Sequence, residues 1–503
     1  MTLLLGIDAG LTVTKVALYD THGQQVAAGA ARCPLHHPRP RHVERDMEAA
    51  WESCVAAVRG CLRTAGSRAA EIAAVGLTGH GDGLYLVDRQ LRPVRPAILA
   101  LDSRAEALRA SWRADGVLPE VLATSGQEPT AVSQATLWAW LARDEPKALA
   151  STRWLLYCKD WLRLQLTGEV CTDVTDASAS FMAMATRAYE PRLLELLGLG
   201  DDLMDRLPPV LSSTNVVGAV TRQAAAATGL PAGTPVVVGC HDVHASAVGM
   251  GGIEHGRLSL IAGTFGINQV MTKTPAIDPR WQVRASVLDD RYLAMSTSPG
   301  SAASLEWLIE RVAPELIELA ASQRRSPWEI ALEEAAAVMD GPSQVFFQPF
   351  FYGSDPRGDT GAALVGLRGW HGRGHVIRAV LEGVVFNHRW HVDALRSKFA
   401  IEPPARLGGG AARSSLWVQL FTDGLGSPVE VVDTAETGAR GVAVLAGTGV
   451  GVYDSIPAGV ANAVRVSRNH EPDPGSEQRL NEAYARFMAL TTALRIMTQG
   501  SGQ

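Results

Sequence analysis

Two glycine-turn hairpins constrain the fold of this 503-residue chain more than any other feature of its sequence. The first spans Leu3 to Tyr19 and the second spans Leu258 to Met271, and each is an apolar strand, a Gly/Thr turn and a second apolar strand. A turn of this kind points several backbone N–H groups into one small concavity, which is the type of anion site that phosphates occupy. The repeat predicts two lobes, each carrying a phosphate-binding turn, and indicates phosphoryl transfer.

Length and composition define the broad class of the protein. At 503 residues the chain exceeds the ~150 residues typical of one domain, so we expect two large lobes. A formal net charge of -6 gives no basic balance for nucleic acid and disfavours a membrane surface. No signal segment and no run of ~18 apolar residues is found, which predicts a cytoplasmic protein. The six cysteines contain no C-x-x-C pair, so we expect neither a disulfide framework nor a cysteine zinc site.

The order of predicted elements indicates α/β layering. Apolar residues recur at helical spacing in Glu44 to Thr64, and a strand at Ile72 to Thr78 follows. Trp154 to Asp173 is typical of a helix stopped by Gly168. From Leu258 the order of hairpin, helices and strand repeats, which indicates that the two halves share an architecture.

Asp8 gives the first turn a hard oxygen ligand. It directly follows the first strand and precedes the turn, so its carboxylate suits Mg²⁺, usually held through water. Thr12 and Lys15 add a hydroxyl and a cation for phosphate oxygens. The alternative is a tight hairpin in which Asp8 caps its own turn. In the second copy, Gly263 and Thr264 keep the open backbone.

Asp242 is the candidate general base. It lies in GCHDVHASAVG, which predicts a glycine-flanked strand end where a carboxylate meets a substrate hydroxyl. Phosphoryl transfer needs a base that accepts the alcohol proton in line with the γ-phosphate. Two alternatives use the same neighbourhood. One is a metal cluster of His241, Asp242 and His244, and the other takes Cys240 as a nucleophile.

Polar side chains after two further strands are candidates for the sugar site. The loop GHGDG carries His80, Gly81 and Asp82 at a strand end, where open α/β sheets place ligands. Asp102 and Arg104 follow another apolar strand and can line the same pocket, or they form a surface ion pair. Near the C-terminus, GGGAARS allows an adenine or ribose to approach the backbone closely, and a plain structural turn is the alternative. Neither a P-loop nor a strand-linked G-x-G-x-x-G is found, so ATP binding rests on the hairpins.

In this order the motifs resemble those of the FGGY carbohydrate kinases, from Leu4 to about Tyr453. The matching segments are GIDAGLTVTK, VERDMEAAW, KDWLRLQLTGE, GCHDVHASAVG, IAGTFG, LGGGAARSSLWVQLFTD and ETGARGVAVLAG. The resemblance implies a two-lobed α/β fold of the actin-like ATPase (ribonuclease H-like) type, with duplicated domains and an interlobe cleft. The N-terminal domain would occupy residues 1–250 and the C-terminal domain residues 251–503.

The resemblance also implies ATP, Mg²⁺ and a role for each matching residue. Asp242 would be the catalytic base and would contact the substrate, and Asp8 would serve Mg²⁺. The residues assigned to the phosphates are Thr12, Lys15, Gly263 and Thr264, and those assigned to the adenosine side are Gly409, Gly410 and Ser414. The partner is a small sugar or polyol, and a homodimer is compatible with the sequence.

Within the family the chain is most similar to L-xylulose kinases, through Phe265 and the segment QPFFYGSD. D-xylulose kinases usually show Met-His where this chain has Gly81 and Asp82. An acidic Asp82 disfavours an anionic sugar acid, because like charges in a confined site repel. The resemblance therefore implies a kinase for a neutral ketose such as L-xylulose or D-xylulose, with an erythritol-type polyol kinase as the alternative.

Two readings from other classes remain at this point. One is a non-catalytic actin-like nucleotide switch that binds partners. The other takes Asp8-Ala9-Gly10 and Asp359-Thr360-Gly361 as an aspartic-protease pair. Sugar-dependent ADP release separates the kinase from the first, and peptidase activity at acidic pH would be required by the second.

Overall fold

The structure is a computed structural model that describes residues 2–351 and 361–499. It contains two compact units, each built from segments that are far apart in the sequence. Unit 1 comprises Met1–His255, Met271–Ala294 and Glu436–Val464, and unit 2 comprises Gly256–Val270, Met295–Ala435 and Arg465–Gln503. The predicted domains, residues 1–250 and 251–503, are continuous segments of the chain, whereas the two units are defined by contacts in space. The division at residue 250 therefore stays a proposal.

Unit 1 is built on a mixed sheet with the strand order β13-β14-β5-β1-β2-β3, and β15 also pairs with β5. The first predicted hairpin is present as the antiparallel pair β1 and β2, and β5 runs parallel to β1. The strands are β1 (Leu3–Ala9), β2 (Val13–Asp20), β3 (Gln25–Arg32), β5 (Ile72–Gly79), β13 (Val216–Ala219), β14 (Pro235–Val237) and β15 (Cys240–His241).

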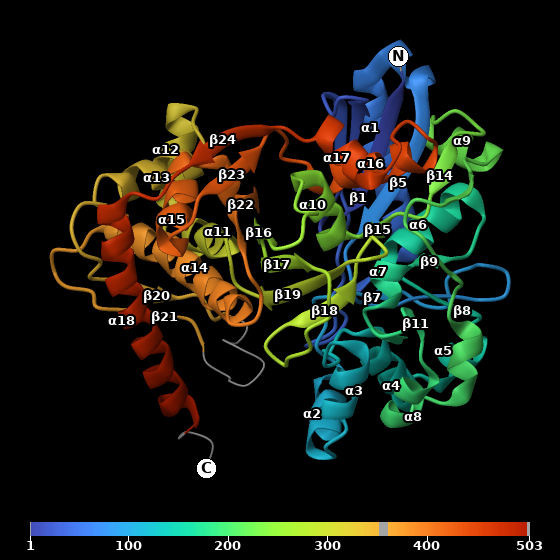
Figure 1. Cartoon of the computed structure of the whole chain (residues 1–503), viewed down its shortest axis with the longest axis horizontal. Coiled ribbons are helices and arrows are strands. Elements are labelled where there is room, and N and C mark those ends of the chain that lie inside the picture. The colour runs from blue at the N-terminus through green and yellow to red at the C-terminus, as the bar shows by residue number, and fades with distance from the viewer. Residues whose placement is uncertain (1, 352–360, 500–503) are drawn as a thin grey trace. The chain divides into compact units, whose positions relative to one another are not determined.

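Helices cover both faces of this sheet, which explains why β1 is apolar along almost its whole length. α1 (Met47–Ala65) contacts β3 and β2, while α16 (Thr437–Gly449) contacts β1 and β5, as Figure 1 shows. Strands buried on both faces are expected to be continuous apolar runs rather than alternating ones. The remaining helices of unit 1 are α2 (Glu106–Ala114), α3 (Leu118–Ser125), α4 (Gln134–Asp144), α5 (Pro146–Ser151), α6 (Cys158–Thr167), α7 (Val174–Ala177), α8 (Pro191–Leu197), α9 (Arg222–Thr228), α10 (Asp242–Met250) and α17 (Ile456–Ala463).

Unit 2 repeats the strand pattern of unit 1. Its neighbouring strands β17-β16-β22-β23-β24 are antiparallel, parallel, parallel and antiparallel in turn, as are β2-β1-β5-β14-β13. The second predicted hairpin forms β16 and β17, so the duplication indicated by the sequence is present in the topology. The bounds are β16 (Arg257–Ala262), β17 (Gly266–Thr272), β22 (Glu402–Gly409), β23 (Val429–Val432) and β24 (Val466–His470), with the helices α11 (Ala303–Trp307), α12 (Glu315–Gln323), α13 (Pro327–Ala336), α14 (Arg373–Arg396), α15 (Ser415–Leu425) and α18 (Pro474–Gln499).

Several local predictions need correction. The helix expected from Glu44 begins at Met47, because Glu44–Arg45 form the short strand β4 and Asp46 caps the helix. The helix expected from Trp154 is preceded by β8 (Trp154–Leu156), although it ends at Gly168 as predicted, with that glycine at a φ of +79°. Asp242 does not end a strand but begins α10.

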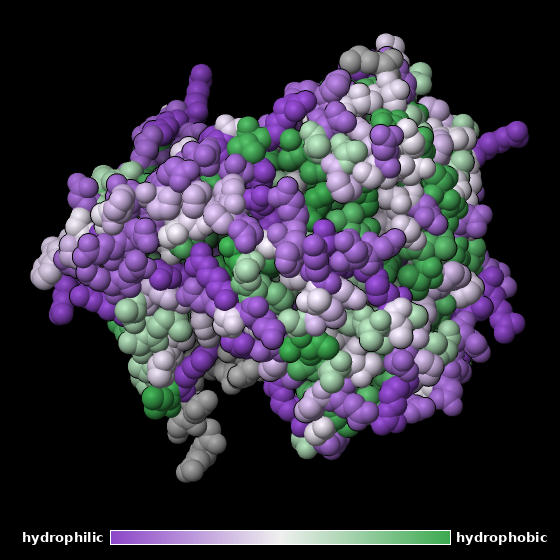
Figure 2. Space-filling view, viewed as in Figure 1, coloured by the Kyte–Doolittle hydropathy of each residue, from purple (hydrophilic) through white to green (hydrophobic). Residues whose placement is uncertain are grey.

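Some predicted features lie outside the described residues. They are Gly353, Ser354 and Asp355 of QPFFYGSD, and Asp359 and Thr360 of the second protease-like motif. Within residues 2–351 and 361–499, no helix combines the length and apolarity needed to cross a membrane. The face drawn in Figure 2 carries mostly hydrophilic and intermediate side chains, interrupted by smaller hydrophobic patches.

The helices α10 and α16 approach each other through glycines. A Cβ atom at Gly249 would lie 1.8 Å from the carbonyl oxygen of Thr437, and one at Gly441 would lie 1.9 Å from that of Ala245. Real Cβ atoms do not approach backbone oxygens this closely, so these positions require glycine. The close contact matters for function because Asp242 begins α10.

We expect Gly249→Ala to lower the free energy of unfolding by about 3 kcal/mol or more, because the added methyl group forces two packed backbones apart. Urea or thermal denaturation measures the effect. Gly60→Ala is the matched control, since the nearest atom to its new Cβ would be 3.6 Å away inside α1, and it is expected to stabilise the protein by up to about 1 kcal/mol. Equal stability of the two variants would contradict the packing described here.

Candidate active site

Three loops of unit 1 open at the same edge of its sheet. The strand register pairs Ala9 of β1 with Gly79 of β5, and Gly79 also pairs with His241 of β15. The first glycine turn directly follows Ala9, the loop GHGDG begins at Gly79, and Asp242 directly follows His241. Carboxyl ends of parallel strands are where open α/β sheets bind ligands. The fold therefore brings together site residues that are more than 230 positions apart in the sequence.

The first turn is held in place from both sides. The Gly10 N–H donates to the carbonyl oxygen of Val13 at 3.1 Å, which closes the turn. The guanidinium of Arg45, a buried residue of the segment VERDMEAAW, donates to the carbonyl oxygen of Leu11. Thr12 is exposed at the tip. No motif indicated a role for Arg45, and the structure shows that this side chain fixes the predicted phosphate turn.

Asp8 lies on β1 against the first turn of α16. A Cβ atom at Gly438 would lie 2.3 Å from Asp8 Oδ2, so only glycine leaves room for the carboxylate there. Lys15 pairs with Asp8 in the strand register, but its Nζ lies 3.0 Å from Oε2 of Glu436. Burial raises the pKa of Asp8 to about 6, with Lys15 opposing and Glu436 reinforcing the shift. The roles of Asp8 and Lys15 toward ligands stay predictions.

Asp242 is the first residue of α10, and its side chain is 35% exposed. Its Oδ1 accepts the Val243 N–H at 2.8 Å and lies 3.2 Å from Nε2 of His241. Burial raises its pKa to about 8, the charges of Asp8 and Asp176 add to the shift, and the Val243 N–H opposes it. Burial and negative neighbours thus outweigh the favourable helix start. The result is a partly accessible carboxylate with a strong tendency to hold a proton.

In the loop GHGDG the side chain of His80 is hydrogen-bonded to another residue, and Asp82 has a strained backbone. Nε2 of His80 lies 3.0 Å from the Tyr85 hydroxyl, and burial together with the Arg45 charge lowers the His80 pKa to about 3. Asp82 has a φ of +53°, a conformation rare for residues other than glycine. Its Oδ1 lies 3.6 Å from Nη2 of Arg284, a buried residue of β18 (Gln282–Ala285) that the sequence analysis did not single out.

Asp102 and Arg104 form an ion pair that is buried rather than exposed. Their side chains are 0% and 1% exposed, and Arg104 Nη2 lies 2.8 Å from Oδ2 of Asp102. Arg104 also pairs with Glu44 at 2.7 Å, and Asp102 accepts the Val43 N–H at 2.6 Å. The alternative of a surface ion pair is therefore wrong about location. Contact between Asp102 and a substrate stays a prediction.

A buried cluster of charged side chains around Lys159 contacts His241, the residue before Asp242. Nζ of Lys159 lies 2.7 Å from Asp160, 3.0 Å from Asp173 and 2.8 Å from Asp176. Burial opposes the charge of Lys159, but these carboxylates outweigh it and raise its pKa well above the usual range. Asp176 in turn lies 2.7 Å from Nδ1 of His241. The motif KDWLRLQLTGE was recognised in the sequence, but its link to His241 runs through Asp176, which is 65 residues from that histidine.

In unit 2 the second predicted phosphate turn lies between β16 and β17. The Gly263 N–H donates to the carbonyl oxygen of Phe265 at 3.3 Å, and Thr264 is exposed at the tip. A Cβ atom at Gly266 would lie 3.1 Å from Nε2 of His388, which also lies 2.8 Å from the Ser301 hydroxyl. The turn therefore rests on a buried polar cluster.

The glycine-rich strand end of β22 lies beside this second turn. Gly409 pairs with Ala262 in the register and has a φ of +86°, which favours glycine. Gly410 follows it, with no atom closer than 3.8 Å to a Cβ placed there. Ser414 caps α15 by accepting the Trp417 N–H at 3.3 Å. Unit 2 thus collects its predicted phosphate and adenosine residues at one sheet edge, and their ligand contacts stay predictions.

The two alternatives around Asp242 gain no support from the arrangement. Among the described residues, no group of three or more His, Cys, Asp or Glu side chains is placed to hold a metal ion. His241 ends β15 and His244 lies in the first turn of α10, with ring centres 6.0 Å apart. Nδ1 of His241 is hydrogen-bonded to Asp176. Cys240 is fully buried, and burial raises its pKa well above the usual value, so it remains a thiol.

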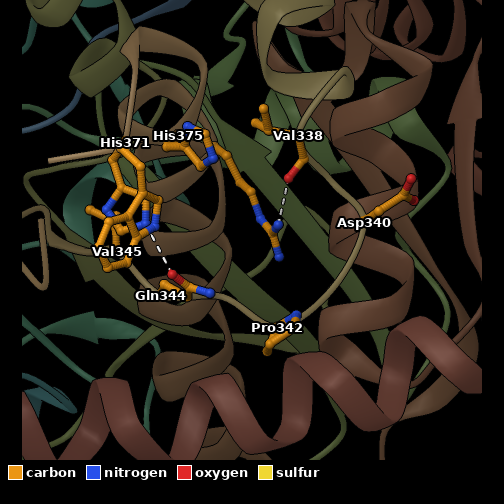
Figure 3. A pocket seen from close by; sticks show the side chains of 9 residues that line it. Val338, Asp340, Pro342, Gln344, Val345, His371 and His375 are labelled. Carbon is orange, nitrogen blue, oxygen red and sulfur yellow. Dashed lines mark hydrogen bonds between the residues drawn. The ribbon is translucent and has the colours of Figure 1, made fainter. Parts of the chain in front are cut away.

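A cavity of about 200 Å³ in unit 2 is lined by none of the predicted site residues. In Figure 3 a dashed line marks the hydrogen bond that His371 donates to Gln344. Arg378 donates to the carbonyl oxygen of Val338. Arg378 also pairs with Glu382 at 2.9 Å. The guanidinium of Arg378 is thus hydrogen-bonded and ion-paired within the protein, so this cavity is a poor candidate for a phosphate site.

The raised pKa of Asp242 predicts a pH-dependent stability difference. A carboxyl whose folded pKa is about 8 contributes stability below its unfolded pKa of 3.8, and this contribution is lost as the pH rises through 8. Asn does not titrate. The Tm of Asp242→Asn minus that of the original protein is therefore expected to increase by several degrees from pH 5 to pH 9. A thermal scan of both proteins across this range measures it, and a constant difference would contradict the raised pKa.

Comparison with known proteins gives matches along nearly the whole chain. The model described as the FGGY family of carbohydrate kinases, N-terminal domain, matches residues 3–249, and that of the C-terminal domain matches residues 258–450. The chain is 31% identical to the Escherichia coli (strain K12) protein named L-xylulose/3-keto-L-gulonate kinase, over 98% of this chain and 97% of that protein. It is 27% identical to the erythritol kinase of Brucella abortus (strain 2308), over 98% and 96% respectively.

A solved structure confirms the fold class predicted from the sequence. The xylulose kinase from Rhodospirillum rubrum superposes with a TM-score of 0.85 at 28% identity, over 98% of this chain and 99% of that one. The two-lobed α/β architecture and the enzyme class that the motifs indicated are therefore shared with known sugar kinases.

Proposed function

The chain belongs to the FGGY family of carbohydrate kinases, and we propose that it transfers the γ-phosphoryl group of ATP to a hydroxyl of a neutral ketose, first of all L-xylulose. D-xylulose is the nearest alternative. The observation that supports this most is Asp242, a carboxylate 35% exposed at the sheet edge where the first phosphate turn also opens.

Asp242 is the proposed general base. In its ionised form it accepts the proton of the reacting sugar hydroxyl, whose oxygen forms a bond to the γ-phosphorus as the bond to the bridging oxygen of ADP breaks. A carboxyl with a pKa of about 8 holds the abstracted proton well at neutral pH. Its Oδ1 is fixed by the Val243 N–H, which leaves Oδ2 to the substrate.

Asp8 is the proposed Mg²⁺ residue. Its carboxylate lies at the first phosphate turn in a space that glycine at position 438 keeps open, and carboxylate oxygen is the donor that Mg²⁺ prefers. When bound with ATP, Mg²⁺ would neutralise phosphate charge. Thr12 and Lys15 would contact phosphate from the same turn.

In unit 2 the proposed nucleotide residues are Gly263 and Thr264 for the phosphates, and Gly409, Gly410 and Ser414 for the adenosine. Their support is their common position at the edge of β16 and β22. The cytoplasmic location and the homodimer expected from the sequence are likewise kept as proposals. Light scattering of the purified protein tests the homodimer.

The sugar site is proposed to include His80, Gly81 and Asp82. A negative Asp82 repels an anionic sugar acid, whereas ketose hydroxyls can donate to its carboxylate. Arg284 lies 3.6 Å from Asp82 and partly balances this charge, but its side chain is only 2% exposed and does not face solvent. We therefore place neutral ketoses ahead of acids such as 3-keto-L-gulonate.

Coupled ADP release with Mg²⁺ and ATP over a panel of sugars tests the proposed function. The panel contains L-xylulose, D-xylulose, pentitols, tetritols and sugar acids. The expected result is a kcat/KM at least about tenfold higher for a neutral ketose than for any acid, equivalent to 1.4 kcal/mol of discrimination. A sugar acid as best substrate would overturn the substrate class, and no ADP release with any compound would overturn the kinase.

An erythritol-type polyol kinase is the second candidate. It is supported by the 27% identity to the Brucella abortus erythritol kinase over 98% of this chain. The same panel separates the two, because a polyol kinase would prefer a tetritol over either ketose.

A further inference from the structure

We propose that His241 is a positioning residue for Asp242, held at the end of a buried chain that runs from Lys159 through Asp176. This inference rests on the proposed function, in which Asp242 is the general base. It gives a task to the motif KDWLRLQLTGE, which the chemistry described above does not use, and a structural reason for glycine at position 81, which is also proposed for the sugar site.

The imidazole of His241 is contacted on both nitrogens. Nδ1 lies 2.7 Å from Oδ1 of Asp176, and Nε2 lies 3.2 Å from Oδ1 of Asp242. Nη1 of Arg284 lies 3.2 Å and 3.0 Å from the same two nitrogens. His241 and Asp176 are both almost completely buried. The ring orientation is therefore fixed by three neighbours, and one of them is the proposed base.

Asp176 is itself held in place by an ion pair with Lys159. Its Oδ2 lies 2.8 Å from Nζ of Lys159, which is 1% exposed. The neighbouring Thr175 accepts the backbone N–H of His241 at 2.9 Å, so α7 contacts both the main chain and the side chain of this histidine. A side chain with so many fixed partners retains little freedom, which is how supporting residues preorganise a reacting group.

Gly81 makes room for the imidazole. A Cβ atom at position 81 would lie 1.6 Å from Cε1 and 2.1 Å from Nε2 of His241. Position 81 does not have a positive φ, so its backbone suits alanine, and the three atoms nearest to the added Cβ all belong to the histidine ring. The glycine is therefore required by the position of His241, which is a structural reason for a residue that the sequence analysis assigned to the substrate.

The hydrogen-bond chain also has a direction. Burial and the Arg284 charge lower the pKa of His241 to about 3, so the ring is neutral and carries one N–H. The shorter contact assigns that N–H to Nδ1, which donates to Asp176 and leaves Nε2 as an acceptor. Nε2 then accepts from Nη1 of Arg284 at 3.0 Å, and as an acceptor 3.2 Å from Oδ1 it repels an ionised Asp242. This repulsion weakens once Oδ2 of Asp242 has taken the sugar proton. The imidazole thus favours the state that the base reaches during transfer.

Replacing His241 by Asn and by Gln tests this role. The amide of Asn can still donate to Asp176 but reaches no further, whereas the longer Gln can offer its carbonyl oxygen to Asp242. We expect His241→Asn to lower kcat by about 10- to 100-fold, as loss of a supporting hydrogen bond typically does, with KM for sugar and ATP within about threefold. His241→Gln is expected to recover at least about tenfold of this loss.

Gly81→Ala tests the same role without removing a polar group. The methyl group displaces the imidazole, so kcat is expected to fall as in His241→Asn, whereas Gly60→Ala leaves kcat unchanged. His244→Asn is the control for the loss of a buried imidazole, because His244 lies in α10, three residues after His241, and its ring centre is 6.0 Å from that of His241. It is expected to lower Tm but to keep kcat within about threefold.

The outcomes separate this inference from the proposed function. Wild-type kcat in both His241→Asn and Gly81→Ala, beside an inactive Asp242→Asn, would overturn the positioning role alone. Equal kcat losses in His241→Asn, His241→Gln and His244→Asn would also overturn it, because a purely structural role predicts that pattern. Full activity of Asp242→Asn would remove the base and the positioning role together. A kcat loss in His241→Asn that His241→Gln partly restores would support the inference.

Discussion

Replacing Asp242 by Asn is expected to lower kcat for sugar phosphorylation by about 10²- to 10⁴-fold, the range that a general base contributes. Asn keeps the shape of the side chain and can still accept the Val243 N–H, so the helix start is preserved. It cannot take the proton of the sugar hydroxyl. Steady-state ADP release measures kcat, and isothermal titration calorimetry should give an ATP affinity within about threefold of the original, because the loss lies in the transition state.

Asp201→Asn is the matched control for this prediction. Asp201 is an exposed carboxylate of unit 1 in the short helix Asp201–Arg206. The same change of charge there should leave kcat unaltered, which separates loss of the base from a general effect of net charge. If Asp242→Asn kept a rate near that of the original protein, Asp242 would have no part in proton transfer.

Replacing Lys159 by Met is expected to destabilise the protein by about 3–5 kcal/mol, which is the largest effect on stability that we predict. The ammonium group is 1% exposed and lies within 3.0 Å of three carboxylates, each of which is buried. Removing it leaves negative charges without their common partner. Arg163 lies 3.0 Å from Asp160 and retains part of that balance, but it does not pair with Asp173 or Asp176 in the described cluster.

The effect of Lys159→Met should also depend on pH. Lys159 lowers the pKa of Asp160, so the stability from this pairing is present above the unfolded pKa of 3.8 and is lost as the pH falls through the folded value. Denaturation curves should therefore show a smaller difference below pH 3.8 than at pH 8. Arg192→Ala is the control, because the Arg192–Glu120 pair is 54% exposed on both sides and should cost less than about 1 kcal/mol. Equal losses in the two variants would contradict the account of the cluster.

The sequence predicted those parts of the fold that rest on local patterns. Apolar runs on either side of a Gly/Thr turn are sufficient to indicate β1 with β2 and β16 with β17. The stop at Gly168 follows from the need for a left-handed residue after the helix. The motif GCHDVHASAVG predicted Asp242 at a glycine-flanked strand end, and β15 does end directly before it. The structure shows that Asp242 itself begins α10, which packs against α16.

The contacts that hold His241 could not be predicted from sequence patterns. The pairing of Asp176 with His241 spans 65 residues, and that of Arg284 with His241 spans 43. Such contacts depend on the sheet register and on which helix covers which strand, and neither is encoded by spacing. The requirement for Gly81 was also hidden, because the ring that excludes a side chain there comes from another strand.

Phosphorus NMR of a reaction that contains the protein, Mg²⁺, ATP and L-xylulose tests the central claim most directly. Our account predicts a new phosphomonoester resonance that grows in step with ADP, with no matching inorganic phosphate, and that does not form with Asp242→Asn. Inorganic phosphate in place of a sugar phosphate, or the same phosphomonoester from Asp242→Asn, would contradict it.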